Sequence, residues 1–212
     1  MVAWIAAAAQ PKTAFVISLA GVGTPISEIL LYQTHVLGVA SGLSDAQIRS
    51  NDQLNSSVYS IVEKSKTQED AVKKLGVFFK KYTKKMTQEQ RVAMHLTDLE
   101  IAGICSQATS QWLFTLFHTR PADYMKQVQC PVLALNGDRD LQVEAATNLA
   151  GIKAGLLKSP SVTCHTLPEL NHLMQECETG TVEEYGTIEQ TMSPRVLEMM
   201  GKWLEGLKTE GK

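Results

Sequence analysis

Three short apolar runs, rich in β-branched residues, constrain the fold of this chain more than any other feature. They read AFVISLAGVG at residues 14–23, PVLALNGDRD from Pro131, and SVTCHTLP at residues 161–168. A short apolar run with β-branched members that ends in glycines, as the first of these does, is typical of a strand buried on both faces of a sheet, and the other two runs are similar. A helix-compatible stretch from Glu144 to Leu157 separates the second run from the third. Two strands joined by a helix form a parallel pair, so the sequence predicts the α/β class.

Residues 24–118, between the first and second runs, read as an all-helical excursion. Three pairs of residues have the spacing of helix N-caps, in which a side-chain oxygen accepts a hydrogen bond from the backbone three positions on. The pairs are Ser44 with Gln47, Thr67 with Asp70, and Thr87 with Gln90. We therefore expect several helices here, inserted into the sheet-bearing part of the chain.

The helix that follows Thr67 has two distinct faces. Its apolar residues step by three and four and form one stripe that is expected to pack inward: Val72, Leu75, Phe79, Tyr82 and Met86. The other face carries Lys73, Lys74, Lys80, Lys81, Lys84 and Lys85. No aromatic platform is expected beside these lysines on the polar face, which favours a solvated helix face over a nucleic-acid site.

Helices are also predicted near both ends of the sequence. Val2 to Ala9 is rich in alanine and precedes Pro11, a residue that helix interiors exclude. The alternative is the tail of a secretion signal, but no Lys or Arg precedes the apolar stretch. Near the other end, Ser193 and Pro194 suit the N-cap and first position of a helix. Its inward face is expected to hold Val196, Leu197, Met200, Trp203 and Leu204.

Composition and charge exclude several classes of protein. The chain has 212 residues, and 20 basic against 22 acidic residues give a net charge of −2, so no overall charge attracts it to nucleic acid or an anionic membrane. No apolar run approaches the roughly 20 residues of a membrane-spanning helix. His, Cys and Asp never cluster at metal-ligand spacing, and the Gly-Val-Gly of residues 21–23 lacks the third glycine of a dinucleotide-binding loop. We expect no metal or organic cofactor, and free buried thiols at Cys105, Cys130, Cys164 and Cys177.

Polar residues follow the second and third apolar runs, at the carboxyl ends of the predicted strands, which is where ligands bind in open parallel sheets. Asp140 follows the second run, and His172 follows the third. Because the carboxyl ends of neighbouring parallel strands lie at one edge, we expect the carboxylate and the imidazole to meet there. The carboxylate would then fix the imidazole tautomer and stabilise its protonated form. The other histidines do not follow a predicted strand in this way: His35, His95, His118 and His165. Of these, His165 lies within a predicted strand, where it is expected to pack.

The residues around these two side chains resemble the α/β-hydrolase family. The stretch LNGDRDLQV at residues 135–143 is similar to the turn that carries the triad acid of that family, with Asp140 in its position. The stretch LPELNHLMQ at residues 167–175 is similar to the loop of the triad base, with His172 in its position. The resemblance continues to Trp203 and is strongest with bacterial serine hydrolases that act on esters or related acyl compounds.

This resemblance implies the C-terminal part of an α/β-hydrolase fold, with about three parallel strands and flanking helices, plus a helical cap. Residues 1–23 and 119–212 would form the core portion, and residues 24–118 the cap. Trp112, Phe114 and Phe117 lie near the return from the cap, where they would line an apolar acyl pocket or serve as ordinary core.

One departure from the family matters more than the match. The family nucleophile lies in Gly-x-Ser-x-Gly, a motif that this sequence lacks. Ser18 lies inside the first predicted strand, and Ser41 lacks the preceding glycine. The expectation is that the nucleophile lies upstream of Met1, in a parent protein of which this sequence is a part, rather than that it was lost naturally.

Two functions follow as expectations. The parent protein would be a serine hydrolase of carboxylic esters or related acyl compounds, with His172 as base and Asp140 as orienting acid, while the chain as given would be inactive. The alternative is a non-catalytic binding or assembly module that contacts a partner through the helical insertion. We expect a small acyl or ester substrate for the parent, no nucleic acid and no membrane span. We also expect a homodimer, formed through the open edge of strand 14–20 or by exchange of the N-terminal helix.

Overall fold

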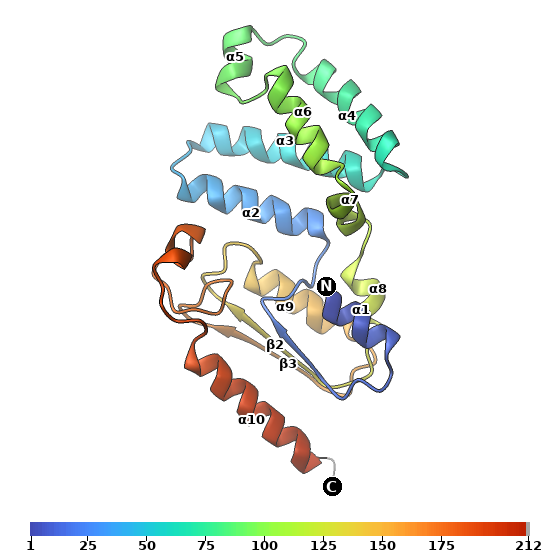
Figure 1. The fold of residues 1–212 in the computed structure, drawn as a ribbon, viewed down its shortest axis with the longest axis vertical. Coiled ribbons are helices and arrows are strands. Elements are labelled where there is room, and N and C mark those ends of the chain that lie inside the picture. Colours follow the sequence, from blue (N-terminus) through green and yellow to red (C-terminus); the bar gives the residue numbers. More distant parts are fainter. Residues whose placement is uncertain (211–212) are drawn as a thin grey trace. The chain divides into compact units, whose positions relative to one another are not determined.

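The computed structural model describes residues 1–210, and side chains for residues 1–207. It is a mixed α/β structure (Figure 1) that divides into two units. Met1–Ile48 and the described residues from Arg120 onward form the sheet unit, and Arg49–Thr119 form the helical unit. The elements are α1 (Val2–Ala9), β1 (Val16–Leu19), α2 (Ile26–Ala40), α3 (Asp45–Glu63), α4 (Gln68–Tyr82), α5 (Gln88–Ala93), α6 (Asp98–Ala108), α7 (Gln111–Phe117), α8 (Pro121–Met125), β2 (Val132–Gly137), α9 (Ala145–Gly155), β3 (Val162–Leu167), the 3₁₀ helix η1 (Val182–Gly186) and α10 (Pro194–Glu210).

The three strands form one parallel sheet in the order β1-β2-β3. Val132 of β2 lies opposite Val16 of β1 and Val162 of β3, so the strands begin in register. Each of the three predicted runs therefore contains a strand, and the parallel α/β architecture is confirmed. β1 is shorter than its run, because the chain leaves the sheet before the glycines of residues 21–23.

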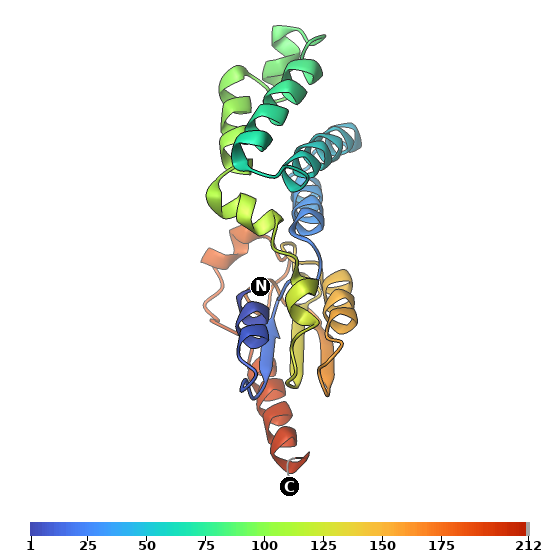
Figure 2. The same cartoon turned by 90° about the vertical axis from the view of Figure 1, so that its right-hand side faces the viewer.

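The side chains of β2 alternate between two apolar cores, since successive residues of a strand point to opposite faces. Val132 and Ala134 face a core shared with α1, α8 and α9, whereas Leu133 and Leu135 face a core that includes residues of α10. Figure 2 shows the sheet unit with these helices beside its strands. The helices contribute Trp4, Ala7, Met125, Leu149 and Ile152 to the first core, and Val196 to the second. Burial of β2 on both faces explains why its sequence is apolar from Val132 to Leu135.

The helical unit has a core of its own, formed where its apolar stripes meet. Its buried residues are Val58, Val62, Ala71, Leu75, Phe79, Leu96, Ala108 and Phe117. The predicted caps are present. The Thr67 side chain accepts from the backbone N–H of Asp70, and Thr87 and Gln90 form a capping box, in which the side chain of each accepts from the backbone N–H of the other. A further box, Thr97 with Glu100, begins α6. The Ser44–Gln47 pair also forms, in the sheet unit.

Several side chains differ from the expectations of the sequence. Val72 is 49% exposed and Leu197 55% exposed, because each lies at the margin of its apolar stripe rather than at its centre. His165 is exposed rather than packed, because it lies outside the buried core that faces α10. Only Cys130 of the four free thiols is fully buried.

The grouping of α2 also differs from the division at residues 23 and 24 expected from the sequence. This helix belongs with the sheet unit, where Ile29 is buried and the Tyr32 hydroxyl donates to the backbone oxygen of Asp140. In the part of the chain described, no helix is both long and apolar enough to cross a membrane.

Candidate active site

Asp140 lies in the turn after β2, where backbone hydrogen bonds fix its side chain. Its Oδ1 accepts from the backbone N–H of Gln142 at 2.8 Å and of Val143 at 2.9 Å. Asp readily forms such turns, because its short side chain reaches the backbone two residues further on. The Asp140 side chain is fully buried, so the turn presents the carboxylate from the interior of the sheet unit.

Gly137 lets the loop after β3 approach this turn. A Cβ atom on Gly137 would lie only 2.0 Å from the carbonyl oxygen of Leu170, so a residue with a side chain does not fit without a backbone shift. The backbone N–H of Arg139 donates to the same Leu170 oxygen at 3.1 Å. Asp138 Oδ1 also accepts from the backbone N–H of Glu169 at 2.6 Å. These hydrogen bonds therefore join the turn after β2 to the loop after β3, next to Asp140.

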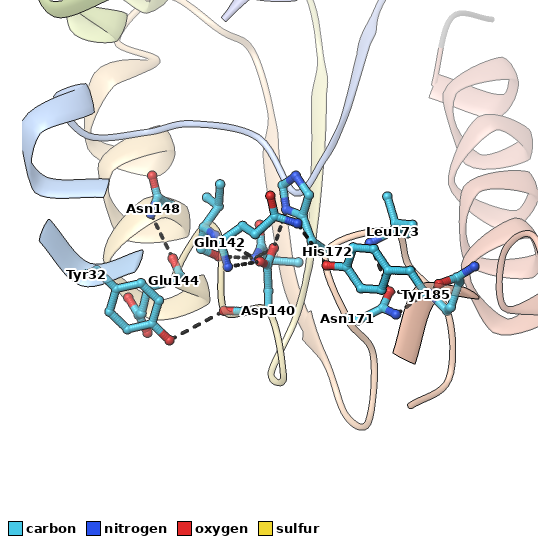
Figure 3. A network of polar contacts seen from close by, with 12 residues as sticks. Tyr32, Asp140, Gln142, Glu144, Asn148, Asn171, His172, Leu173 and Tyr185 are labelled. Carbon is cyan, nitrogen blue, oxygen red and sulfur yellow. Dashed lines mark hydrogen bonds and ion pairs between the residues drawn. The ribbon is translucent and has the colours of Figure 1, made fainter. Parts of the chain in front are cut away.

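His172 projects from the loop after β3, which a buried amide holds in shape (Figure 3). The Oδ1 of Asn171 accepts from the backbone N–H of Leu173 at 2.9 Å and of Gln175 at 3.0 Å. Its Nδ2 donates to Oε1 of Gln175 at 3.0 Å. Asn171 is fully buried, so these bonds replace the water that its amide loses on folding.

The structure brings the predicted acid and base together. Nδ1 of His172 lies 2.9 Å from Oδ2 of Asp140, and the His172 side chain is 27% exposed. An ionised carboxylate only accepts hydrogen bonds, so Nδ1 carries the proton of this contact, and in the neutral form of the ring the lone pair is then on Nε2. An imidazole in this state can take up a proton at Nε2, and the adjacent carboxylate then stabilises the resulting cation.

Asn136, which the sequence analysis did not single out, completes the surroundings of the carboxylate. It is fully buried near the end of β2, and its Nδ2 donates to Oδ2 of Asp140 at 3.2 Å and to the Val143 oxygen at 2.9 Å. Both partners of this Nδ2 are acceptors, which fixes the orientation of the Asn136 amide. The Oδ1 of Asn136 is buried and has no hydrogen-bond partner among the described residues. The Asp140 carboxylate thus accepts four N–H groups, from Gln142, Val143, Asn136 and His172. The available signal was a polar residue inside an otherwise apolar strand.

Two tyrosines flank the pair of Asp140 and His172. The Tyr32 hydroxyl of α2 donates to the Asp140 backbone oxygen at 3.4 Å, and burial, together with the charges of Glu144 and Asp140, raises the Tyr32 pKa. The Tyr185 hydroxyl accepts from Nε2 of Gln142 at 2.8 Å. Burial raises the pKa of Tyr185 as well, against a smaller opposing effect of Gln142. Both hydroxyls therefore keep their protons at neutral pH.

The three aromatic residues expected at an acyl pocket lie on α7, in the helical unit. Trp112 is 73% exposed. Phe114 stacks on His118 with a centroid separation of 4.2 Å. Phe117 is 3% exposed and packs against Tyr59 with centroids 5.4 Å apart. Phe117 is therefore a core residue of its unit, and the pocket role of the three stays a prediction.

Other groups with nucleophilic or metal-binding chemistry lie in unsuitable settings. Ser18 is 7% exposed inside β1, and Ser41 is an exposed residue at the end of α2. Burial raises the pKa of each free thiol, which disfavours the reactive thiolate at Cys105, Cys130, Cys164 and Cys177. Within residues 1–210, no group of three or more His, Cys, Asp or Glu residues could hold a metal ion.

Comparison of the chain with protein-family models, with curated proteins and with solved structures found no match.

Proposed function

We propose that this chain supplies the acid and base of an α/β-hydrolase site that cleaves carboxylic esters or related acyl compounds through a serine nucleophile. The observation that carries the proposal is the 2.9 Å contact between His172 Nδ1 and Asp140 Oδ2. Loops that follow two adjacent parallel strands make this contact, in the chain order acid and then base. In the proposed fold, residues 24–118 serve as the helical cap.

The geometry allows each residue a defined role in this reaction. Nε2 of His172 would accept the serine proton as the hydroxyl oxygen attacks the acyl carbon, and would return that proton to the leaving alkoxide. Water would then repeat the sequence and release the acid. Asp140 keeps its negative charge throughout, because its task is to hold Nδ1–H and to stabilise the imidazolium.

The proposal predicts different behaviour for the 212-residue chain and for a longer parent. Because the sequence contains no Gly-x-Ser-x-Gly, the chain alone should neither hydrolyse p-nitrophenyl esters above background nor react with a fluorophosphonate probe. The longest in-frame product of its locus should do both. There, His172→Ala should lower kcat by at least about a thousandfold.

His165→Ala is the matched control, since it removes an exposed histidine from β3. The control should leave the esterase rate unchanged. A longer product that hydrolyses no ester, or one whose rate survives His172→Ala, would overturn the proposed function. Stoichiometric labelling of the 212-residue chain would instead reveal a nucleophile within it.

A binding or assembly module is the second candidate function. It is favoured by the missing nucleophile motif and by large apolar side chains exposed on the helical unit, among them Leu99 and Trp112. Capture of a defined partner that is unaffected by His172→Ala would support it. Loss of that capture in the same variant would argue against it, because the imidazole belongs to the sheet unit.

We further propose that β1 pairs with a second copy of the chain. Among the described strands, β1 lies at one edge of the sheet and pairs with β2 alone, which leaves the backbone row of its other side available. A two-fold axis would place β1 against β1 of the partner copy, or the two copies would exchange α1. Light scattering at micromolar concentration should give the mass of a dimer, and the mass of a monomer would contradict the pairing.

A further inference from the structure

We propose that the groove between α3 and α4 of the helical unit binds a free, single-chain anionic amphiphile, such as a long-chain alkyl carboxylate. A cavity of about 370 Å³ lies there, a volume within the range of small-molecule sites. Three apolar residues, Ile61, Val77 and Phe78, line it together with Asp70, Lys73 and Lys74. This groove is separate from the pair of Asp140 and His172 and has no part in the proposed reaction.

The apolar part of the groove is held in place but is open to solvent. Phe78 packs against Phe79 and Tyr82, with ring centroids 5.2 Å and 5.5 Å away, so its ring is fixed. Val77 is an apolar residue on the lysine-bearing face of α4, four residues after Lys73, and it is 70% exposed. An apolar side chain exposed next to a concave apolar surface favours a ligand with a hydrocarbon tail.

The charged part of the groove selects the head group. Asp70 binds Lys74 with an Nζ–Oδ2 distance of 2.6 Å, so the charge of that lysine is already balanced. Lys73 forms no ion pair with any residue in the described part of the chain, and its ammonium therefore remains to bind an anion. The flanking lysines of α4, among them Lys80 and Lys81, add to the positive potential. A cationic head would be repelled by these groups.

The experiment is calorimetric titration of the full 212-residue chain with dodecanoate below its micelle concentration. We expect saturable binding at one site with a Kd on the order of 0.1 mM, weakening as salt is raised. Dodecyltrimethylammonium has the same tail and the opposite charge, and should bind at least about tenfold more weakly. Acetate, which has the head without the tail, should give no heat of binding at the same concentration.

Two variants and a control locate the site. Val77→Asp should weaken dodecanoate binding at least about tenfold, since it adds a negative charge and removes apolar surface. Lys73→Met should weaken it about fivefold and flatten the salt dependence. Leu99→Asp is the matched control, because Leu99 is 84% exposed on α6 and does not line the groove. All three sites are exposed, so circular dichroism should show unchanged folding.

Specific outcomes would overturn the proposal. Equal affinities for the anionic and cationic amphiphiles would show that the tail alone is bound. Equal effects of Val77→Asp and Leu99→Asp would place the ligand elsewhere. Binding to phosphatidylglycerol vesicles without binding to monomeric dodecanoate would identify a membrane surface, not a free amphiphile, as the partner.

Discussion

Replacing Asn136 by Asp should make the stability of this protein strongly dependent on pH. The Asn136 amide is fully buried and donates from Nδ2 to Oδ2 of Asp140 across 3.2 Å. An ionised Asp at this position has no proton to donate, so two carboxylates would face each other in the interior. Like charges at this range cannot both be accommodated, and one carboxyl must bind a proton.

The magnitude follows from the separation of the two groups. Two unit charges about 4 Å apart repel by about 4 kcal/mol at an effective dielectric constant of 20. The pKa of the introduced carboxyl would therefore be raised above its unfolded value of about 3.9. A raised carboxyl pKa weakens the folded state as pH rises above the unfolded pKa. The loss of stability should be small at pH 4, grow by about 1.4 kcal/mol per pH unit, and reach about 4 kcal/mol near pH 7.

Urea unfolding between pH 4 and pH 8, followed by circular dichroism, measures this difference. Asn136→Leu is the control, since it loses the same two donated hydrogen bonds without adding a charge. We expect Asn136→Leu to change the unfolding free energy by a nearly constant amount across this range. Parallel pH profiles for the two variants would refute the reasoning, because they would mean that no ionised carboxylate faces Asn136.

Three further predictions test the site and its support. In Asp140→Asn, the carboxamide N–H should take the place of Oδ2 and donate to Nδ1 of His172, so the imidazole proton should move to Nε2. ¹⁵N NMR of the imidazole detects this change of tautomer. An unchanged tautomer would disprove the assigned contact. Gly137→Ala should destabilise by about 3 kcal/mol in thermal unfolding, since its Cβ would meet the Leu170 oxygen at 2.0 Å. Gly201→Ala, with open space around its Cβ, should be neutral or mildly stabilising, and equal losses in both would contradict the steric argument. Because burial raises the Tyr32 pKa, Tyr32→Phe should remove a component that titrates above pH 10 at 295 nm, and loss of a component at or below pH 10 would contradict this.

The sheet and the central contact of the site could be predicted because both depend on local sequence patterns. Apolar runs mark strands buried on two faces, and a helix between two of them makes the pair parallel. Parallel strands place their following loops at one edge, so the meeting of Asp140 and His172 required no knowledge of side-chain packing. Strand ends were less well predicted, since the glycines of residues 21–23 continue the apolar run after β1 has ended.

The residues that were missed depend on contacts between distant parts of the chain. Tyr32 reaches Asp140 across 108 positions of sequence, and no periodic pattern in α2 encodes that approach. Asn136 has a local signal, but its role depends on where the following turn places the Asp140 carboxylate. Periodicity likewise assigns Leu197 and His165 to an element, whereas their exposure is decided by what covers that element.

The loop that carries His172 combines backbone strain with dense support. Glu169 and Met174 adopt φ values of 63° and 61°, in the left-handed region that L-residues avoid at a cost of about 1–3 kcal/mol each. Glycine would relieve this strain, yet it would leave a hole at position 174, because Met174 is 1% exposed in the core that faces α10. The three side-chain hydrogen bonds of Asn171 close the loop between these two residues. Packing and hydrogen bonds thus hold the strained backbone and direct the imidazole at Asp140. In the proposed hydrolase, this support would orient the imidazole for proton transfer before a substrate binds.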